Sequence, residues 1–198
     1  EFSANNEEAY FRSINNYQGF KTAQQNRRNV IYAGSNSGLI HAFNAETGDE
    51  EWAFLPPILI GKLPNIINNA LNGTVDGSNG GSNAIFGVDG SPVVHDVFIK
   101  GLRLDGSNVI VEQDPDWRTI LFVPFGRGGS GFSVLDVTNP ILKDNKGPLH
   151  MYTVYNDYVN NVVYIADSEG TVREEPYFSG AVSIQNSLEG QKAMDNLN

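Results

Sequence analysis

Apolar and polar positions alternate in short segments along the first third of the chain, and each segment ends at a turn that contains glycine. Val30 to Ala33, Leu39 to Phe43 and Glu50 to Leu55 have the apolar content of three short strands. The turns between them, 34–38 and 44–48, are rich in Gly and Asn, which tolerate positive φ. Three strands in one regular meander predict a single blade of a β-propeller.

The pattern changes after Pro56-Pro57, where neither proline can donate to a strand ladder. Apolar residues then recur at three- and four-residue steps from Ile58 to Leu71, which predicts an amphipathic helix with a kink at Pro64. Residues 72–83 are rich in Gly, Asn and Ser and predict a mobile loop.

A second blade-like unit is predicted from Phe86 to Pro140. Its first part is a turn and a strand over 87–97, followed by a hairpin over 99–113 whose turn is Asp105-Gly106. Asp114-Pro115-Asp116 is expected to break the chain, because proline lacks the backbone N–H of a strand. Strands are then predicted from Trp117 to Pro124 and over 132–137, with a tight glycine-rich turn between them.

A third, weaker unit contains strands over 149–155 and 162–166, a turn over 167–170 and a further strand over 171–173. Val163 to Arg173 repeats the character of Ile31 to Phe43, and a repeated supersecondary unit is what a propeller requires. Residues 177–198 look irregular, with a short helix near 187–197.

Length limits how many blades are present. A blade takes about 40 to 50 residues and a ring usually at least four blades, so 198 residues hold two to three. The predicted class is all-β, a partial propeller with a short helical insertion, and we expect a fragment of a larger protein. The predicted parts are a lead-in at 1–28, a β domain at 29–176 with its insertion at 56–87, and a tail at 177–198.

Charge excludes some partners. The formal net charge is −10 and the sequence has no basic stripe, which argues against binding to nucleic acid or to an anionic membrane. No apolar run reaches 18 residues, so no transmembrane helix is expected in this segment. The absence of cysteine excludes disulfides, thiolate metal sites and cysteine nucleophiles.

The glycine-rich segment GRGGSG at 126–131 is a candidate phosphate loop. No Gly-Lys-Ser/Thr follows it, and the next segment has a strand pattern where a nucleotide loop needs a helix. A tight turn that lets blades pack closely is favoured. Ser130 does not lie in a Gly-x-Ser-x-Gly elbow, so no serine nucleophile is predicted.

Metal sites are also disfavoured. The histidines His41, His95 and His150 lack zinc-type spacing, and a structural role is favoured for His41. The Asp-rich turns that begin at Asp76, Asp105 and Asp144 lack the alternating oxygen ligands of a calcium loop.

Simple structural roles are favoured for several other conspicuous side chains. Trp52 and Trp117 are predicted to pack in the core rather than to hold a ligand. The carboxylate pairs Glu50/Glu51 and Asp114/Asp116, and the arginine pair 27–28, are predicted to be solvated.

Two blocks of sequence go beyond generic propeller character. The first is VIYAGSNSGLIHAFNAETGDEEWAFLPP; the second joins VDGSPVVHDV to WRTILFVPFGRGGSGFSVLDVTNP. Together they resemble the PilY/PilC family of type IV pilus tip adhesins and assembly factors, over about residues 29–140. The matching positions carried into a site prediction are Gly34, Asn36, Gly38, His41, Phe43, Gly48, Asp89, Gly90, Asp96, Trp117, Arg118, Gly126, Gly128, Gly129 and Asp136.

The resemblance implies a non-enzymatic scaffold or adhesion module at the cell surface, either at the pilus tip or associated with the outer membrane. Its implied partners are pilus subunits (minor pilins) or a host or surface receptor. No catalytic residue and no cofactor is predicted. The family's calcium loop is not matched, since residues 156–160 fit it poorly, and no Arg-Gly-Asp is present.

Two alternatives remain open. The first block also resembles the repeats of quinone-cofactor dehydrogenases, with a similar Ala-x-x-Thr-Gly turn and Trp, although the ring and its convergent ligands are not visible here. The other alternative is a non-adhesive propeller scaffold for protein assembly in the envelope.

Overall fold

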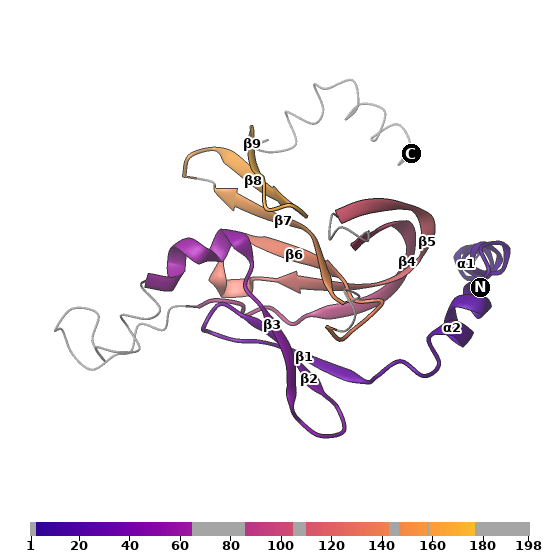
Figure 1. Ribbon diagram of the computed structural model, residues 1–198. Coiled ribbons are helices and arrows are strands. Elements are labelled where there is room, and N and C mark those ends of the chain that lie inside the picture. The colour runs from indigo at the N-terminus through magenta and orange to yellow at the C-terminus, as the bar shows by residue number, and fades with distance from the viewer. Residues whose placement is uncertain (1–2, 65–85, 105–109, 143–146, 158, 177–198) are drawn as a thin grey trace.

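The computed structural model describes residues 3–64, 86–104, 110–142, 147–157 and 159–176 (Figure 1). Within these ranges the chain forms two antiparallel sheets, one of three strands and one of six, with two short α-helices at the start. The architecture is therefore mostly β, as the sequence predicts. The expected mobile loop over 72–83, the turn at Asp105-Gly106 and the tail over 177–198 lie outside the described residues.

The three-stranded sheet is the predicted first blade. Its strands β1 (Val30–Gly34), β2 (Ile40–Asn44) and β3 (Glu50–Phe54) pair in chain order. Both of its connections are turns in which a glycine takes positive φ, 92° at Gly38 and 79° at Gly48. Residues with a Cβ rarely adopt a positive φ, which explains why glycines occupy these turn positions.

The six-stranded sheet also follows chain order. Its strands are β4 (Val93–Leu104), β5 (Ile110–Pro124), β6 (Gly131–Asp136), β7 (Leu149–Asp157), β8 (Val162–Asp167) and β9 (Val172–Pro176). The predicted second and third units are not separate sheets here. Pairing between β6 and β7, with Ser133 opposite Thr153, joins them into one.

The predicted chain break at Asp114-Pro115-Asp116 is wrong, because β5 runs through all three residues. The pairing with β4 passes from Lys100–Pro115 directly to Leu102–Glu112, so two residues of β5 oppose one of β4. Such a bulge is a place where a strand accepts proline. In Figure 1, β4 and β5 curl strongly over their outer halves.

The lead-in segment contains two helices, α1 (Ser3–Ile14) and α2 (Tyr17–Ala23), beside the curled end of β4 and β5 (Figure 1). Where a helix is predicted after Pro57, the structure has a 3₁₀ helix, η1 (Pro57–Lys62), and residues 65–71 of the prediction lie outside the described residues. No helix in the described part of the chain is long and apolar enough to cross a membrane.

The core lies between the two sheets. Side chains of β2 and β3 pack against β5, β6 and their connections, and Leu59 of η1 closes one side. The buried cluster consists of Ile40, Ala42, Trp52, Leu59, Val88, Leu121, Val123, Phe125, Leu135 and Val137. Because these residues come from both sheets, they pack the sheets together as one body.

Candidate functional site: a seam between the two sheets

A short bridging segment, residues 87–90, is bonded to both sheets. The backbone N–H of Val88 donates to the carbonyl oxygen of Ser35 in the β1–β2 turn, at 3.0 Å. The next N–H, of Asp89, donates to the carbonyl oxygen of Phe125 after β5, at 3.1 Å. Two consecutive residues therefore tie the three-stranded sheet to the six-stranded one, and we call this junction the seam.

The seam is too tight for side chains at its centre. A Cβ on Gly128 would overlap the carbonyl oxygen of Gly87, and a Cβ on Gly87 would overlap the backbone of Gly38. Backbone from three distant parts of the chain thus meets at van der Waals contact, which only glycine allows. The predicted close-packing turn is η2 (Gly126–Gly128), a single turn of 3₁₀ helix.

Other predicted glycines flank the same contact. A Cβ on Gly34 would lie 2.5 Å from the carbonyl oxygen of Val88, and Gly90 packs against Pro124. Gly126 lies against Gly90, and Gly129 lies beside the ring of Tyr155. Gly48 is not part of the seam, because nothing lies within 4 Å of the position its Cβ would take.

Three charged side chains lie in this region. Lys62 of η1 donates a hydrogen bond to the carbonyl oxygen of Gly128, and burial lowers the pKa of Lys62. Asp89 lies 3.9 Å from the guanidinium of Arg127, which is largely exposed. Lys62 therefore fastens the start of the predicted insertion to the glycine turn.

His41 holds the β1–β2 turn from one side. Its Nδ1 lies 2.7 Å from a carboxylate oxygen of Glu50 and its Nε2 lies 3.1 Å from the hydroxyl of Ser35. The Ser35 hydroxyl also donates to the carbonyl oxygen of Leu39, and the His41 ring stacks on Phe43. These contacts fix the turn that supplies the Ser35 carbonyl to the seam.

Asn36 is exposed at the tip of the same turn. The prediction that Glu50 and Glu51 are solvated is confirmed for Glu50, which is 47% exposed although it bonds His41, and is wrong for Glu51, which is 18% exposed and pairs with Arg28. Both carboxylates therefore take part in joining neighbouring segments.

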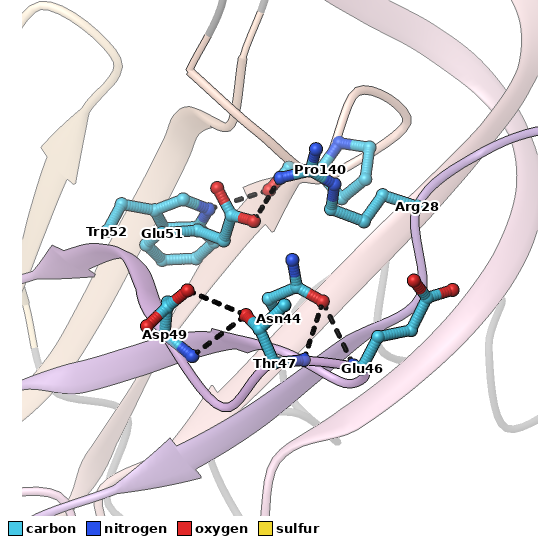
Figure 2. Close-up of polar contacts among 8 residues, drawn as sticks. All are labelled: Arg28, Asn44, Glu46, Thr47, Asp49, Glu51, Trp52 and Pro140. Atoms are coloured by element: carbon cyan, nitrogen blue, oxygen red, sulfur yellow. Dashed lines mark hydrogen bonds and ion pairs between the residues drawn. The ribbon is translucent and has the colours of Figure 1, made fainter.

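A direct bond between the sheets lies beside the second turn of the first blade. The indole N–H of Trp52 donates to the carbonyl oxygen of Pro140 at 2.7 Å (Figure 2). Nearby, Asn44 accepts hydrogen bonds from the backbone N–H groups of Glu46 and Thr47, which caps the β2–β3 turn (Figure 2). Trp52 is 8% exposed, so its predicted place in the core is confirmed.

A polar cluster anchors the N-terminal helices on the six-stranded sheet. Asp96 of β4 accepts hydrogen bonds from the hydroxyls of Tyr17 at 2.7 Å and Thr119 at 2.6 Å. Arg27 donates to the Thr119 hydroxyl at 2.6 Å, so the prediction that both arginines are solvated is wrong for this residue. The hydrogen bond to the Asp96 carboxylate, followed by burial, raises the pKa of Tyr17.

Trp117 continues this anchor. Its indole N–H donates to the carbonyl oxygen of Asn15 at 2.8 Å, and its ring lies 4.5 Å from that of Tyr17 and 5.6 Å from that of Phe98. The residue is 4% exposed, which confirms its predicted core role.

Arg118 and Asp136 lie together on adjacent strands. A guanidinium nitrogen is 3.8 Å from Oδ2 of Asp136, while Oδ1 accepts the backbone N–H of Thr138 at 2.9 Å. Gly101 leaves room for the guanidinium, since a Cβ there would overlap Arg118. Arg118 Nε and Asp136 Oδ2 are buried without a hydrogen bond, so this pair is held by charge alone.

The structure thus gathers most of the predicted residues into three places, namely the seam, the helix anchor and the Arg118–Asp136 pair, whereas Asn36 and Gly48 lie in turns outside them. Sequence reasoning missed Tyr17, Arg27 and Lys62, whose partners lie 66 to 92 positions away along the chain, and Thr119, whose partners Asp96 and Arg27 lie 23 and 92 positions away. In the part of the chain that the structure describes, no three His, Asp or Glu side chains gather as metal ligands would. The contacts among the described residues join segments that are distant in the chain.

The two packed antiparallel sheets are built from chain-consecutive strands, as the blades of a β-propeller are. Residues 8–162 match the PilY1 β-propeller domain family, so the chain belongs to that family. The predicted propeller class and the predicted family are both confirmed.

Similar proteins of known name support the same family assignment. The chain is 39% identical over 124 residues to the type IV pilus biogenesis factor PilY1 of Pseudomonas aeruginosa strain UCBPP-PA14, covering 63% of this chain and 9% of the relative. It is 33% identical over 132 residues to the PilY1 homolog of Xylella fastidiosa strain Temecula1, covering 67% of this chain and 9% of the relative. The chain therefore spans about a tenth of these relatives.

Among solved structures, the crystal structure of the Pseudomonas aeruginosa PilY1 C-terminal domain matches with a TM-score of 0.40 and 24% identity. That match covers 84% of this chain and 33% of the solved one.

Proposed function

We propose that this chain is a non-enzymatic scaffold within a type IV pilus biogenesis factor, and that it presents loops to other pilus components. The observation that carries the proposal is the seam. Two of the glycines that carry the family resemblance, Gly38 and Gly128, both make close backbone contacts with Gly87, and these contacts leave no room for a substrate. Membership of the PilY1 propeller family supports the connection to pili.

The proposed partners are minor pilins or a surface receptor, and the proposed location is the pilus tip or the outer membrane. The names of the relatives support a role in pilus biogenesis. The contact surfaces are proposed to be the insertion over 56–87 and the hairpin tip near Asp105, because loops on a rigid scaffold carry most binding functions.

A deletion tests the proposed contact surface. Removing residues 73–83 from the complete natural polypeptide is expected to reduce surface piliation or surface binding, while the melting temperature of the propeller stays unchanged. The control is Thr47→Ala in an exposed turn of the first blade, which is expected to leave piliation intact. Normal piliation and binding after the deletion would end the proposal for this loop.

The quinone-enzyme alternative has its own readout. A quinoprotein would show cofactor absorbance and dye-linked alcohol oxidation in the complete polypeptide, and the scaffold proposal expects neither. The envelope-assembly alternative expects periplasmic partners and no co-purification with pili, so purification of sheared pili separates it from the proposal.

A further inference from the structure

The glycine turn η2 contacts the insertion over 56–87 at two points that are far apart in the sequence. On one side, the ammonium group of Lys62 donates a hydrogen bond to the carbonyl oxygen of Gly128. On the other side, the carbonyl oxygens of Phe86 and Gly87 lie against the position that a Cβ on Gly128 would take. A single glycine therefore contacts the chain on both sides of the segment that runs from Lys62 to Phe86.

The neighbouring residue in the turn, Arg127, contacts the second of these points with its side chain. Its guanidinium lies over the ring of Phe86, with 5.2 Å between Cζ and the ring centroid. A cation in this position is attracted by the negative face of the aromatic ring. A lysine at one end and an arginine at the other thus fasten the insertion to the same turn. We call this group the neck; it consists of Lys62, Phe86, Gly87, Arg127 and Gly128.

The chain on either side of the neck is anchored in the core. Leu59 precedes Lys62 in η1 and is fully buried, and Val88 follows Gly87 and is 2% exposed. Both side chains belong to the same buried cluster, so the insertion leaves the core and returns to it at one place. Since the backbone is already fixed on both sides, the neck contacts form at little further cost in conformational entropy.

We propose that the neck holds the two ends of the insertion as one cooperative unit, so that releasing either end also releases the other. The carbonyl oxygen of Gly128 accepts the hydrogen bond of Lys62, while its Cα lies against Gly87. A rotation of the peptide after Gly128, once the lysine has left, therefore disturbs the contact with the second end as well. Lys62 and Arg127 are then positioning residues for the proposed contact surface; that use rests on the proposed function, whereas the neck itself does not.

Limited proteolysis tests the coupling, because each end of the insertion carries a cleavage site for a different protease. Trypsin cleaves after Lys62 and chymotrypsin after Phe86, and both cuts require local opening of the chain. The variants are Lys62→Met and Arg127→Met in the complete natural polypeptide, and peptide mass mapping identifies each cut. The matched controls are Lys21→Met on α2 and Arg173→Met on β9, each of which removes an exposed cation outside the neck.

Each variant is expected to expose the end of the insertion that it does not touch. K62M is expected to raise the rate of chymotrypsin cleavage after Phe86 about tenfold, and R127M to raise trypsin cleavage after Lys62 by a similar factor, since each loses a contact made by a charged group. Cleavage after Lys100 in β4 and after Trp117 in β5 is expected to stay at the wild-type rate. The two controls are expected to leave cleavage at both ends of the insertion unchanged.

Two results would overturn the proposal. If either variant leaves the opposite end as protected as in the wild type, the two ends are held independently. If cleavage inside the six-stranded sheet rises by the same factor as cleavage at the neck, the variants loosen the whole fold and the neck is not a separate unit. Surface piliation is measured in the same variants. Normal piliation with an opened neck would count against the proposed contact surface and not against the neck, so the two proposals fail separately.

Discussion

Trp52 and Pro140 are 88 positions apart in the chain, yet the indole N–H of one donates to the carbonyl oxygen of the other at 2.7 Å. Trp52 belongs to β3 and Pro140 follows β6, so the bond spans the two sheets. With the two N–H groups of the bridging segment it joins the sheets by hydrogen bonds as well as by apolar packing.

Trp52→Phe removes the donor and keeps most of the ring. The carbonyl oxygen of Pro140 is then buried without a partner, and the free energy of unfolding is expected to fall by about 1–3 kcal/mol. Trp52→Ala also opens a cavity and is expected to cost about 3–5 kcal/mol. Urea denaturation measures both, and an unchanged midpoint for Trp52→Phe would show that the bond does not stabilise the fold.

Gly128→Ala places a methyl group on the carbonyl oxygen of Gly87. Because both groups are backbone, the seam must separate, and the free energy of unfolding is expected to fall by about 3 kcal/mol or more. Gly61→Ala is the matched control, since nothing lies within 4 Å of its Cβ position, and it is expected to change stability by at most about 0.5 kcal/mol. Equal effects of the two variants would argue against a tight seam.

Tyr17→Phe removes the hydrogen bond to Asp96 and is expected to loosen the N-terminal helices rather than the sheets. Trypsin is expected to cleave faster after Lys21, and the free energy of unfolding is expected to fall by about 1–2 kcal/mol. Tyr10→Phe is the control, because Tyr10 is 66% exposed on the same helical pair. Equal cleavage rates for the two variants would show that the Tyr17 bond does not anchor the helices.

His150 makes stability depend on pH. It stacks on Phe54 across the two sheets at 5.3 Å, and its Nε2 lies 2.8 Å from the hydroxyl of Thr153. Burial lowers the pKa of His150 below its usual 6.5, against the opposing effects of Tyr152 and Asp167.

The unfolded chain therefore takes up this proton at a higher pH than the native protein does. The contribution of neutral His150 is present above pH 6.5 and is lost as the pH falls below it, toward the lower native pKa. His150→Gln is expected to flatten the fall in melting temperature between pH 7 and pH 5. An identical pH profile in wild type and variant would contradict this assignment.

Local chemistry made much of the fold predictable. Gly38 and Gly48 mark turns because each needs positive φ, and the apolar segments between such turns became strands. The predicted break at Pro115 failed because a bulge, which depends on the partner strand, accommodates proline. The joining of the second and third units also depends on a partner, since β6 could pair with β7 or end its own sheet.

The candidate site was predictable in its residues but not in its arrangement. The glycines at 34, 38, 90, 126 and 128 are conspicuous in the sequence. Their close backbone contacts through residues 87–90 depend on the tertiary structure and could not be predicted. Tyr17 and Lys62 carried no signal, because nothing near them in sequence indicates partners 79 and 66 positions away.

Native-state hydrogen exchange at the amide of Val88 tests the seam most directly. If the bridging segment holds the sheets in one cooperative unit, this N–H exchanges only with global unfolding, at the free energy measured for core amides of β5. Gly128→Ala should then lower the protection of Val88 and of the β2 amides together. Exchange of Val88 through a low-energy local opening, while β5 stays protected, would show that the two sheets are separate units.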